Sequence, residues 1–176
     1  MKNKFKALSV ILVVCMLMLG ATSVFAAAFE TPVAITSIGQ SADGQVVQVL
    51  ARRAGVEVSY DSTMAADAIG NYKTIILAVG GSSKGMGAAG INAQQEEARA
   101  NAIISAAKNA GTKIIVMHVG GAERRGDLTD GFIRIAAPAA DMTIVVGDGN
   151  SDGIFANATV VDDMAGATAA LKGAFQ

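Results

Sequence analysis

The centre of the sequence reads Lys73-Thr-Ile-Ile-Leu-Ala-Val-Gly-Gly-Ser-Ser-Lys-Gly-Met-Gly-Ala-Ala-Gly-Ile-Asn92. Its first part, residues 73–79, is a mostly apolar run of the kind found in strands that are buried on both faces. The remainder, residues 80–92, is rich in glycine and carries a single charge at Lys84. We expect this glycine-rich part to be a loop, followed by a helix that starts near Ala93. A strand, a loop and a helix in this order predict one unit of a parallel α/β sheet.

The same alternation of apolar runs and helical patterns continues on both sides of this unit. Apolar runs predict further strands at residues 33–38, 56–60, 113–119 and 142–146, with a short sixth strand at 159–161. Apolar residues at helical spacing predict helices at residues 43–54, 62–69, 93–110, 128–138 and 164–175. We therefore predict one doubly wound α/β domain over residues 27–176, flavodoxin-like, with a mostly parallel sheet of five or six strands and helices on both faces.

The N-terminal segment has the composition of a secretory signal peptide. Three lysines within the first six residues precede an apolar run from Ala7 to Leu19, and Val24-Phe25-Ala26 fits a cleavage site. This three-part pattern predicts a signal peptide over residues 1–26 and a periplasmic or extracellular location. An uncleaved membrane anchor is the alternative, although the apolar run is short for a membrane span.

Charge and cysteine content exclude several classes of function. The whole chain has 14 basic and 15 acidic residues, and three of the basic ones lie in the predicted signal peptide. A net acidic mature domain argues against a nucleic-acid partner, because such a partner requires a basic surface. The one cysteine, Cys15, also lies in the predicted signal peptide. The mature domain therefore has no disulfide and no thiolate metal site.

Three motif spellings in the sequence fail on closer comparison. Gly85-Met-Gly-Ala-Ala-Gly90 has the spacing of a dinucleotide-binding loop, but residues 80–84 separate it from its strand. A Walker A loop requires its lysine after the last glycine, whereas Lys84 precedes it. Asp148-Gly-Asn-Ser-Asp152 is similar to a calcium loop that lacks its final glutamate. We therefore predict no cofactor and no metal.

The long polar loops of the predicted sheet all fall at one edge. Ligands of doubly wound sheets bind beyond the carboxyl ends of the strands, and the loops there cover residues 39–44, 80–92, 118–127 and 147–153. Three basic residues in these loops, together with the N–H groups of glycine-rich turns, favour an anionic ligand such as a carboxylate or phosphate. The alternative for Arg124 or Arg125 is a structural ion pair with Asp127. The candidate ligand-binding residues are Gln40, Ser41, Gly81, Ser82, Ser83, Lys84, Gly85, His118, Gly120, Gly121, Arg124 and Arg125.

A hydrolase is an alternative function for the same loops. Gly81-Ser-Ser-Lys-Gly85 spells G-x-S-x-G, and Ser83, His118 and Asp127 would form a catalytic set. Their order in the chain differs from that of α/β-hydrolases, in which the acid precedes the histidine. A nucleophile elbow also requires a helix directly after the serine, where we expect a loop. An enzyme is therefore the less favoured interpretation.

Several of these loops together resemble a known family. The pattern consists of Gly39-Gln-Ser, Gly80-Gly-Ser-Ser-Lys-Gly, His118-Val-Gly-Gly, Arg124-Arg-Gly and Asp152-Gly-Ile-Phe155. It resembles a family of small secreted bacterial proteins of unknown function, and the resemblance covers essentially the whole mature chain. The resemblance implies an exported single α/β domain and implies no reaction, ligand or catalytic residue.

Taken together, the sequence favours an exported domain that binds a small anionic molecule. A hydrolase using Ser83 and His118, or an accessory module that docks on a membrane transporter or receptor, are the alternatives. The sequence does not indicate an oligomeric state.

Overall fold

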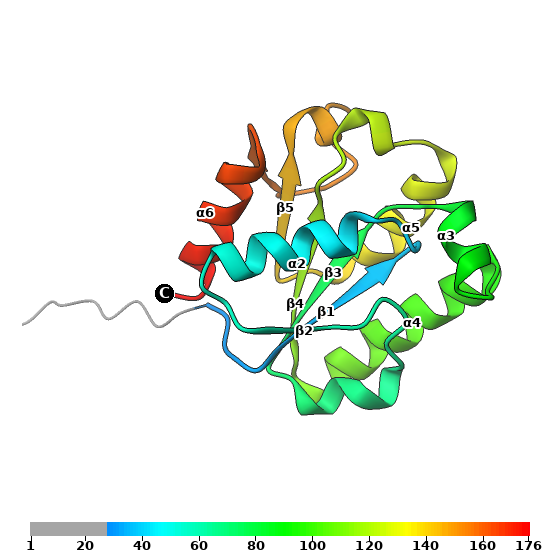
Figure 1. Ribbon diagram of the computed structural model, residues 1–176, viewed down its shortest axis with the longest axis horizontal. Helices are drawn as coiled ribbons and strands as arrows, with labels where there is room; N and C mark the ends of the chain where they lie inside the picture. Colours follow the sequence, from blue (N-terminus) through cyan, green and yellow to red (C-terminus); the bar gives the residue numbers. More distant parts are fainter. Residues whose placement is uncertain (1–27) are drawn as a thin grey trace, which may run out of the picture.

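The computed structural model describes residues 28–176, which form a six-stranded sheet in which all neighbouring strands are parallel (Figure 1). The predicted signal peptide lies outside the described residues. The strand order is β2-β1-β3-β4-β5-β6, which extends the flavodoxin-like order by one strand. The α/β fold class and the sixth strand are thereby confirmed. The strands are β1 Val33–Ile38, β2 Val58–Tyr60, β3 Thr74–Val79, β4 Lys113–His118, β5 Met142–Val146 and β6 Thr159–Val161.

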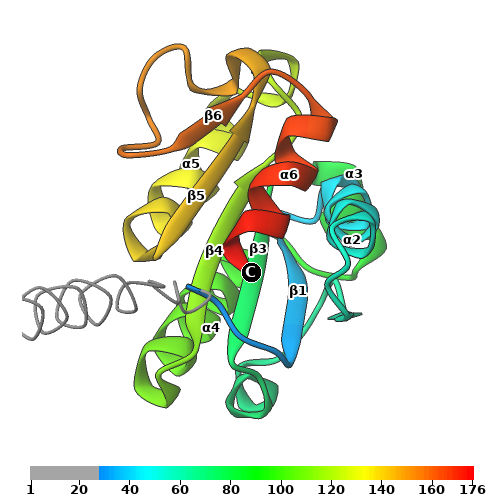
Figure 2. The same ribbon diagram turned by 90° about the vertical axis from the view of Figure 1, so that its left-hand side faces the viewer.

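Helices cover both faces of the sheet (Figure 2). On one face, α2 (Asp43–Arg53) and α6 (Met164–Ala174) pack on a core that includes Ile35, Ile76 and Ile115. On the other face, α4 (Ala93–Ala110) and α5 (Asp127–Ala136) pack on a core that includes Leu77 and Val116. Because β1 and β3 are covered on both faces, all their residues are buried and their sequences form continuous runs without alternation.

Single turns of 3₁₀-helix connect many of these elements. Residues 62–69, which we expected to form a helix, contain one 3₁₀ segment that is displaced toward the C-terminus. The remaining 3₁₀ segments follow β4, α5 and β5. The 3₁₀ segments are η1 Ala66–Asn71, η2 Ala122–Arg124, η3 Ala137–Ala139 and η4 Gly147–Asn150.

The glycine-rich segment after β3 contains a helix, so its prediction as a loop is wrong. Helix α3 covers Ser83–Ala88, and Ser82 caps it by accepting a hydrogen bond of 3.0 Å from the Gly85 N–H. Met86 is buried in the core beneath the helix. Glycine disfavours helix intrinsically, but the cap and the burial of Met86 outweigh that preference here.

The glycines of this segment allow two loops to cross at very short range. Gly81 forms an isolated antiparallel bridge with Gln40, which belongs to the loop after β1. A Cβ atom on Gly85 would overlap the Gln40 carbonyl oxygen, and one on Gly39 would lie 2.6 Å from the Gly80 carbonyl oxygen. The loops that follow β1 and β3 can therefore approach this closely only because these positions lack side chains.

Gly85 and Gly87 provide a matched test of this packing, because both lie within α3. We expect Gly85→Ala to destabilise the protein by about 1–3 kcal/mol, since the added methyl group collides with the Gln40 carbonyl. A Cβ on Gly87 would meet nothing within 4 Å, so Gly87→Ala should stabilise the protein by about 0.5–1 kcal/mol through helix propensity. Urea unfolding of the two variants measures both effects. If both substitutions changed the free energy of unfolding equally, the close approach of the loops after β1 and β3 would be contradicted.

Candidate functional site

The candidate site lies where the chain changes direction across the sheet. Strand β1 has β2 on one side and β3 on the other, and the helices that follow β1 and β3 pack on opposite faces. This arrangement creates a crevice at the carboxyl ends of the two strands, which is the usual ligand position in open α/β sheets. A groove of about 480 Å³ occurs here, and we call it the switch groove. Its lining residues are Gln40, Ser41, Ala42, Gln45, Tyr60, Ser62, Thr63, Ser82, Lys84, Gly85, Ala88 and Ala89.

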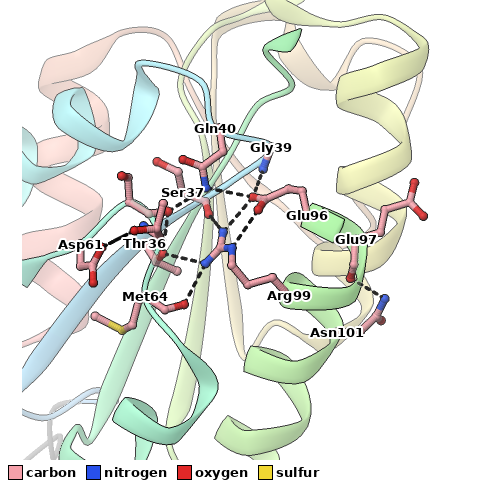
Figure 3. Close-up of polar contacts among 12 residues, drawn as sticks. Thr36, Ser37, Gly39, Gln40, Asp61, Met64, Glu96, Glu97, Arg99 and Asn101 are labelled. Atoms are coloured by element: carbon pink, nitrogen blue, oxygen red, sulfur yellow. Dashed lines mark hydrogen bonds and ion pairs between the residues drawn. The ribbon is translucent and has the colours of Figure 1, made fainter. Parts of the chain in front are cut away.

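The turn at Gly39 and Gln40 forms one wall of the switch groove. Both residues have positive φ angles, of 93° and 58°. Glu96 on α4 holds the turn, because its Oε1 accepts a hydrogen bond of 2.8 Å from the Gly39 N–H and one of 3.2 Å from Gln40 Nε2 (Figure 3). Gln40 Nε2 also donates to the Ser62 carbonyl oxygen at 2.8 Å. These contacts fix the position of Gln40 within the groove wall.

Arg99 completes this network one turn further along α4. It forms an ion pair with Glu96 through two hydrogen bonds of 2.8 Å, and the Glu96 side chain is fully buried. The guanidinium group also donates to the carbonyl oxygens of Ser37 and Met64, the latter at 3.0 Å (Figure 3). Glu96 and Arg99 therefore join α4 to the end of β1 and to the segment after β2.

Sequence reasoning did not identify Glu96 and Arg99. An acidic and a basic residue three positions apart also occur on the exposed face of a helix, where they form a weak surface pair. The one available signal was that these charges interrupt an alanine-rich helix close to its start. That signal does not distinguish a buried network from a solvated one.

Eight of the twelve predicted ligand-binding residues line two separate hollows, and Ser83, His118, Gly120 and Gly121 line neither. Gln40, Ser41, Ser82, Lys84 and Gly85 line the switch groove. Gly81, Arg124 and Arg125 line a second hollow of about 260 Å³, which we call the arginine hollow. Its other lining residues are Glu123, Gly126, Asp127, Leu128 and Thr129.

Of the three predicted cations, Lys84 and Arg124 form no ion pair within the described residues. Both are exposed, and neither forms an ion pair within residues 28–176. Lys84 is the one charged residue that lines the switch groove. The side chain of Arg124 packs over Gly120, with its Cβ and Cγ against the glycine. Within the described residues, one cation without an ion pair therefore lies at each hollow.

Arg125, by contrast, is used by the fold. Its guanidinium group pairs with Asp130 and Asp152, at closest distances of 2.6 and 2.8 Å, and donates to the Gly149 carbonyl oxygen. We predicted, as an alternative, an ion pair between Arg125 and Asp127. Arg125 does form ion pairs, but not with Asp127, so that partner is wrong. Hydrogen bonds from Arg125 lower the pKa of Asp130 and lower the pKa of Asp152 to about 2, and the same hydrogen bonds raise the pKa of Arg125. This cluster connects the loops that follow β4 and β5.

His118 is also enclosed by the protein. Its ring is fully buried, with Nδ1 3.0 Å from the Val79 carbonyl oxygen and Nε2 3.1 Å from that of Gly121. Ser83 lies exposed on α3, and Asp127 lies exposed at the start of α5. Within residues 28–176, no hydrogen bond joins these two side chains to His118. A helix does begin at Ser83, so the objection that a nucleophile elbow lacks its helix does not hold.

Most N–H groups of the glycine-rich segment form hydrogen bonds with other groups of the described chain. The Gly80 N–H donates to the carbonyl oxygen of Ile38 at the end of β1, and the Ser82 N–H donates to that of Gly39. The Gly81 N–H donates to the Thr129 hydroxyl. The first N–H groups of α3 itself, those of Ser83 and Lys84, have no partner within the helix. An anion at this segment would therefore meet side chains and these two N–H groups.

Asp43, a residue that sequence reasoning treated only as a helix start, lies at the same edge. It is 5% exposed, and its Oδ2 atom is buried without a hydrogen-bond partner. A carboxylate at the start of a helix is ordinarily an exposed group that interacts with the helix dipole. The sequence therefore contained no signal that this one would be buried.

The described residues contain neither a metal-binding cluster nor a membrane-spanning helix. Residues 28–176 contain no cluster of three or more histidine, cysteine or acidic residues that could hold a metal ion. None of the helices described is both long enough and apolar enough to cross a membrane.

Comparison with known proteins identifies a family that matches nearly all of the described chain. The model of a domain of unknown function, DUF6305, matches residues 30–175. The chain belongs to this family. No curated protein and no solved structure matches the chain significantly. The resemblance to an uncharacterised family is confirmed at this level, and the comparison assigns no reaction or ligand to DUF6305.

Glu96 and its exposed neighbour Glu97 provide a matched test of the network beneath the switch groove. We expect Glu96→Ala to destabilise the protein by about 3–5 kcal/mol, because it leaves Arg99 largely buried without its partner. Glu97→Ala should change stability by less than about 0.5 kcal/mol, as is usual at an exposed position. Chemical unfolding of both variants measures the difference, and similar losses would contradict the role assigned to Glu96.

Proposed function

We propose that this DUF6305 domain binds a small molecule with an anionic group in the switch groove. The observation that carries the proposal is Lys84, an exposed cation without an ion pair in residues 28–176, in a groove that contains no other charged residue. Unpaired lysines are common on protein surfaces. This one lies at the topological switch point, where ligands of such sheets bind.

The remaining lining of the groove suits a polar ligand. Its volume of about 480 Å³ lies within the ordinary range of small-molecule pockets. Ser41, Tyr60 and Ser82 line it together with Lys84. Hydroxyl groups can donate to carboxylate or phosphate oxygens, and the Lys84 ammonium group supplies the opposite charge. A carboxylate or a phosphate is therefore the ligand group that we propose.

Arg124 supports the same charge preference from the arginine hollow. It is exposed and unpaired within the described residues, whereas Arg125 is held by two carboxylates. Gly81 lines the arginine hollow, and its neighbour Ser82 lines the switch groove, so the two hollows flank the same short segment. We propose Lys84 as the main contact and Arg124 as a second cation for a longer anion.

We further propose that the domain acts outside the cytoplasm, where a membrane transporter or receptor would receive its ligand. The support is the pattern of residues 1–26 in the sequence. N-terminal sequencing of the protein recovered from its native cells tests this location. A mature chain that begins near residue 27 supports export, and a chain that retains Met1 and is recovered in the cytoplasmic fraction contradicts it.

Thermal unfolding in the presence of inorganic phosphate and a panel of small carboxylates tests binding. A ligand that binds only the folded protein raises Tm as its concentration rises. We expect at least one of these anions to raise Tm, and expect added sodium chloride to weaken the effect because Lys84 is exposed to solvent.

Lys84→Ala should remove most of this increase in Tm. The control is Lys108→Ala, because Lys108 is an exposed lysine in the last turn of α4 and does not line the switch groove. This control should keep the full increase. The proposal fails if no anion raises Tm, or if both variants respond like the wild type.

A further inference from the structure

Asp43 has a chemical group that the described fold does not use. The residue begins α2 and is 5% exposed, and its Oδ2 atom is buried without any hydrogen-bond partner. No N–H or O–H group within residues 28–176 donates to this carboxylate. Buried carboxylates are strongly disfavoured unless donors or cations compensate for the lost water. A donor to this oxygen would therefore come from outside the described residues, from water or from a ligand.

Glu96 shows what the fold does with a buried acid that it uses for structure. Its carboxylate accepts hydrogen bonds from Gly39, Gln40 and Arg99, the last of which supplies two N–H groups. Both acids contact the same loop after β1, yet Asp43 receives none of these donors. The Asp43 backbone N–H donates to Ser41 Oγ at 3.3 Å, but no donor within residues 28–176 reaches the Asp43 side chain.

The free Oδ2 atom lies above the carboxyl ends of β3 and β4. A Cβ on Gly80 would lie 2.7 Å from this oxygen and 2.6 Å from Ser41 Oγ. A Cβ on Gly120 would lie 3.5 Å from the same oxygen. Ser41, whose Oγ borders the same position, lines the switch groove, so Asp43 lies next to this groove without being one of its lining residues.

A cation without an ion pair borders the same point. The Arg124 side chain packs over Gly120, which also approaches Asp43 Oδ2, but no ion pair forms between Arg124 and Asp43. Lys84 lines the switch groove, as does Ser41. The edge therefore presents one unsatisfied acceptor together with cations that lack acceptors.

We infer that the ligand of this site is a small zwitterion whose protonated amine donates to Asp43 while its anionic group contacts Lys84 or Arg124. The anionic half of this inference rests on the proposed function, and the amine half rests on Asp43 alone. A hydrogen bond between an ammonium group and a carboxylate is among the strongest available in a protein. It compensates for the burial that the protein itself leaves uncompensated.

The first test uses the ligand-free protein and compares Asp43→Asn with Asp127→Asn. The two aspartates are the first residues of α2 and α5, so both substitutions lose the same favourable interaction with a helix dipole. Asp127 is exposed. We expect Asp43→Asn to raise Tm relative to Asp127→Asn, because it removes a buried charge that has no partner. A larger loss of Tm for Asp43→Asn would show that Asp43 is structural and would overturn the inference.

The second test measures the amine directly by thermal unfolding with the proteinogenic amino acids and their N-acetyl derivatives. Acetylation removes the positive charge of the amine and keeps the carboxylate. We expect at least one amino acid to raise Tm and its N-acetyl derivative to lose the effect. In the Asp43→Asn variant, the apparent affinity for that amino acid should fall by about tenfold or more, which corresponds to the loss of one charged hydrogen bond.

The outcomes separate this inference from the proposed function. If N-acetyl derivatives raise Tm as much as the free amino acids, or if Asp43→Asn binds like the wild type, the amine is not recognised and the inference is overturned. Anion binding that depends on Lys84 would survive either result. If no amino acid raises Tm but phosphate or a simple carboxylate does, the inference again fails and the proposed function stands. If no anion of any kind binds, both fail.

Discussion

The ion pair between Glu96 and Arg99 is the interaction on which the candidate site depends. It lies beneath the turn at Gly39 and Gln40, whose positive φ angles are unfavourable for a glutamine. Glu96 offsets this strain by accepting hydrogen bonds from both residues of the turn. Replacement of a buried ion pair by apolar residues is often neutral for stability. Here, however, apolar residues would leave the N–H groups of the turn without acceptors, so the pair determines the position of the loop after β1.

The close crossing of the loops after β1 and β3 gives a structural reason for the glycines that resemble a ligand-binding motif. Gly81 pairs with Gln40, and Gly85 lies too close to the Gln40 carbonyl oxygen to carry a side chain. Glycine-rich loops bind phosphates when their N–H groups point outward. In this protein most of those groups are bonded to β1, to the loop after β1, to Thr129 or within α3, so recognition of an anion falls chiefly to side chains such as Lys84.

Hydrophobic patterns were sufficient to predict the sheet but not the chemistry of its edge. The strand at 142–146 and the helix at 93–110 have the predicted bounds, because burial on one or both faces leaves a direct pattern in the sequence. Helix α3 was missed because its glycines oppose helix formation, and only its cap and the buried Met86 stabilise it. The burial of Glu96 and Asp43 depends on which elements pack above them, and local sequence contains no record of that packing.

The contrast between these two acids supports the proposal that this edge is a binding site. Both are buried near the same turn. Glu96 receives four hydrogen bonds, whereas the Asp43 carboxylate receives none within the described residues. Proteins that violate a rule of stability at one position commonly do so where function requires it. A ligand with a protonated amine would supply to Asp43 the donors that the fold supplies to Glu96.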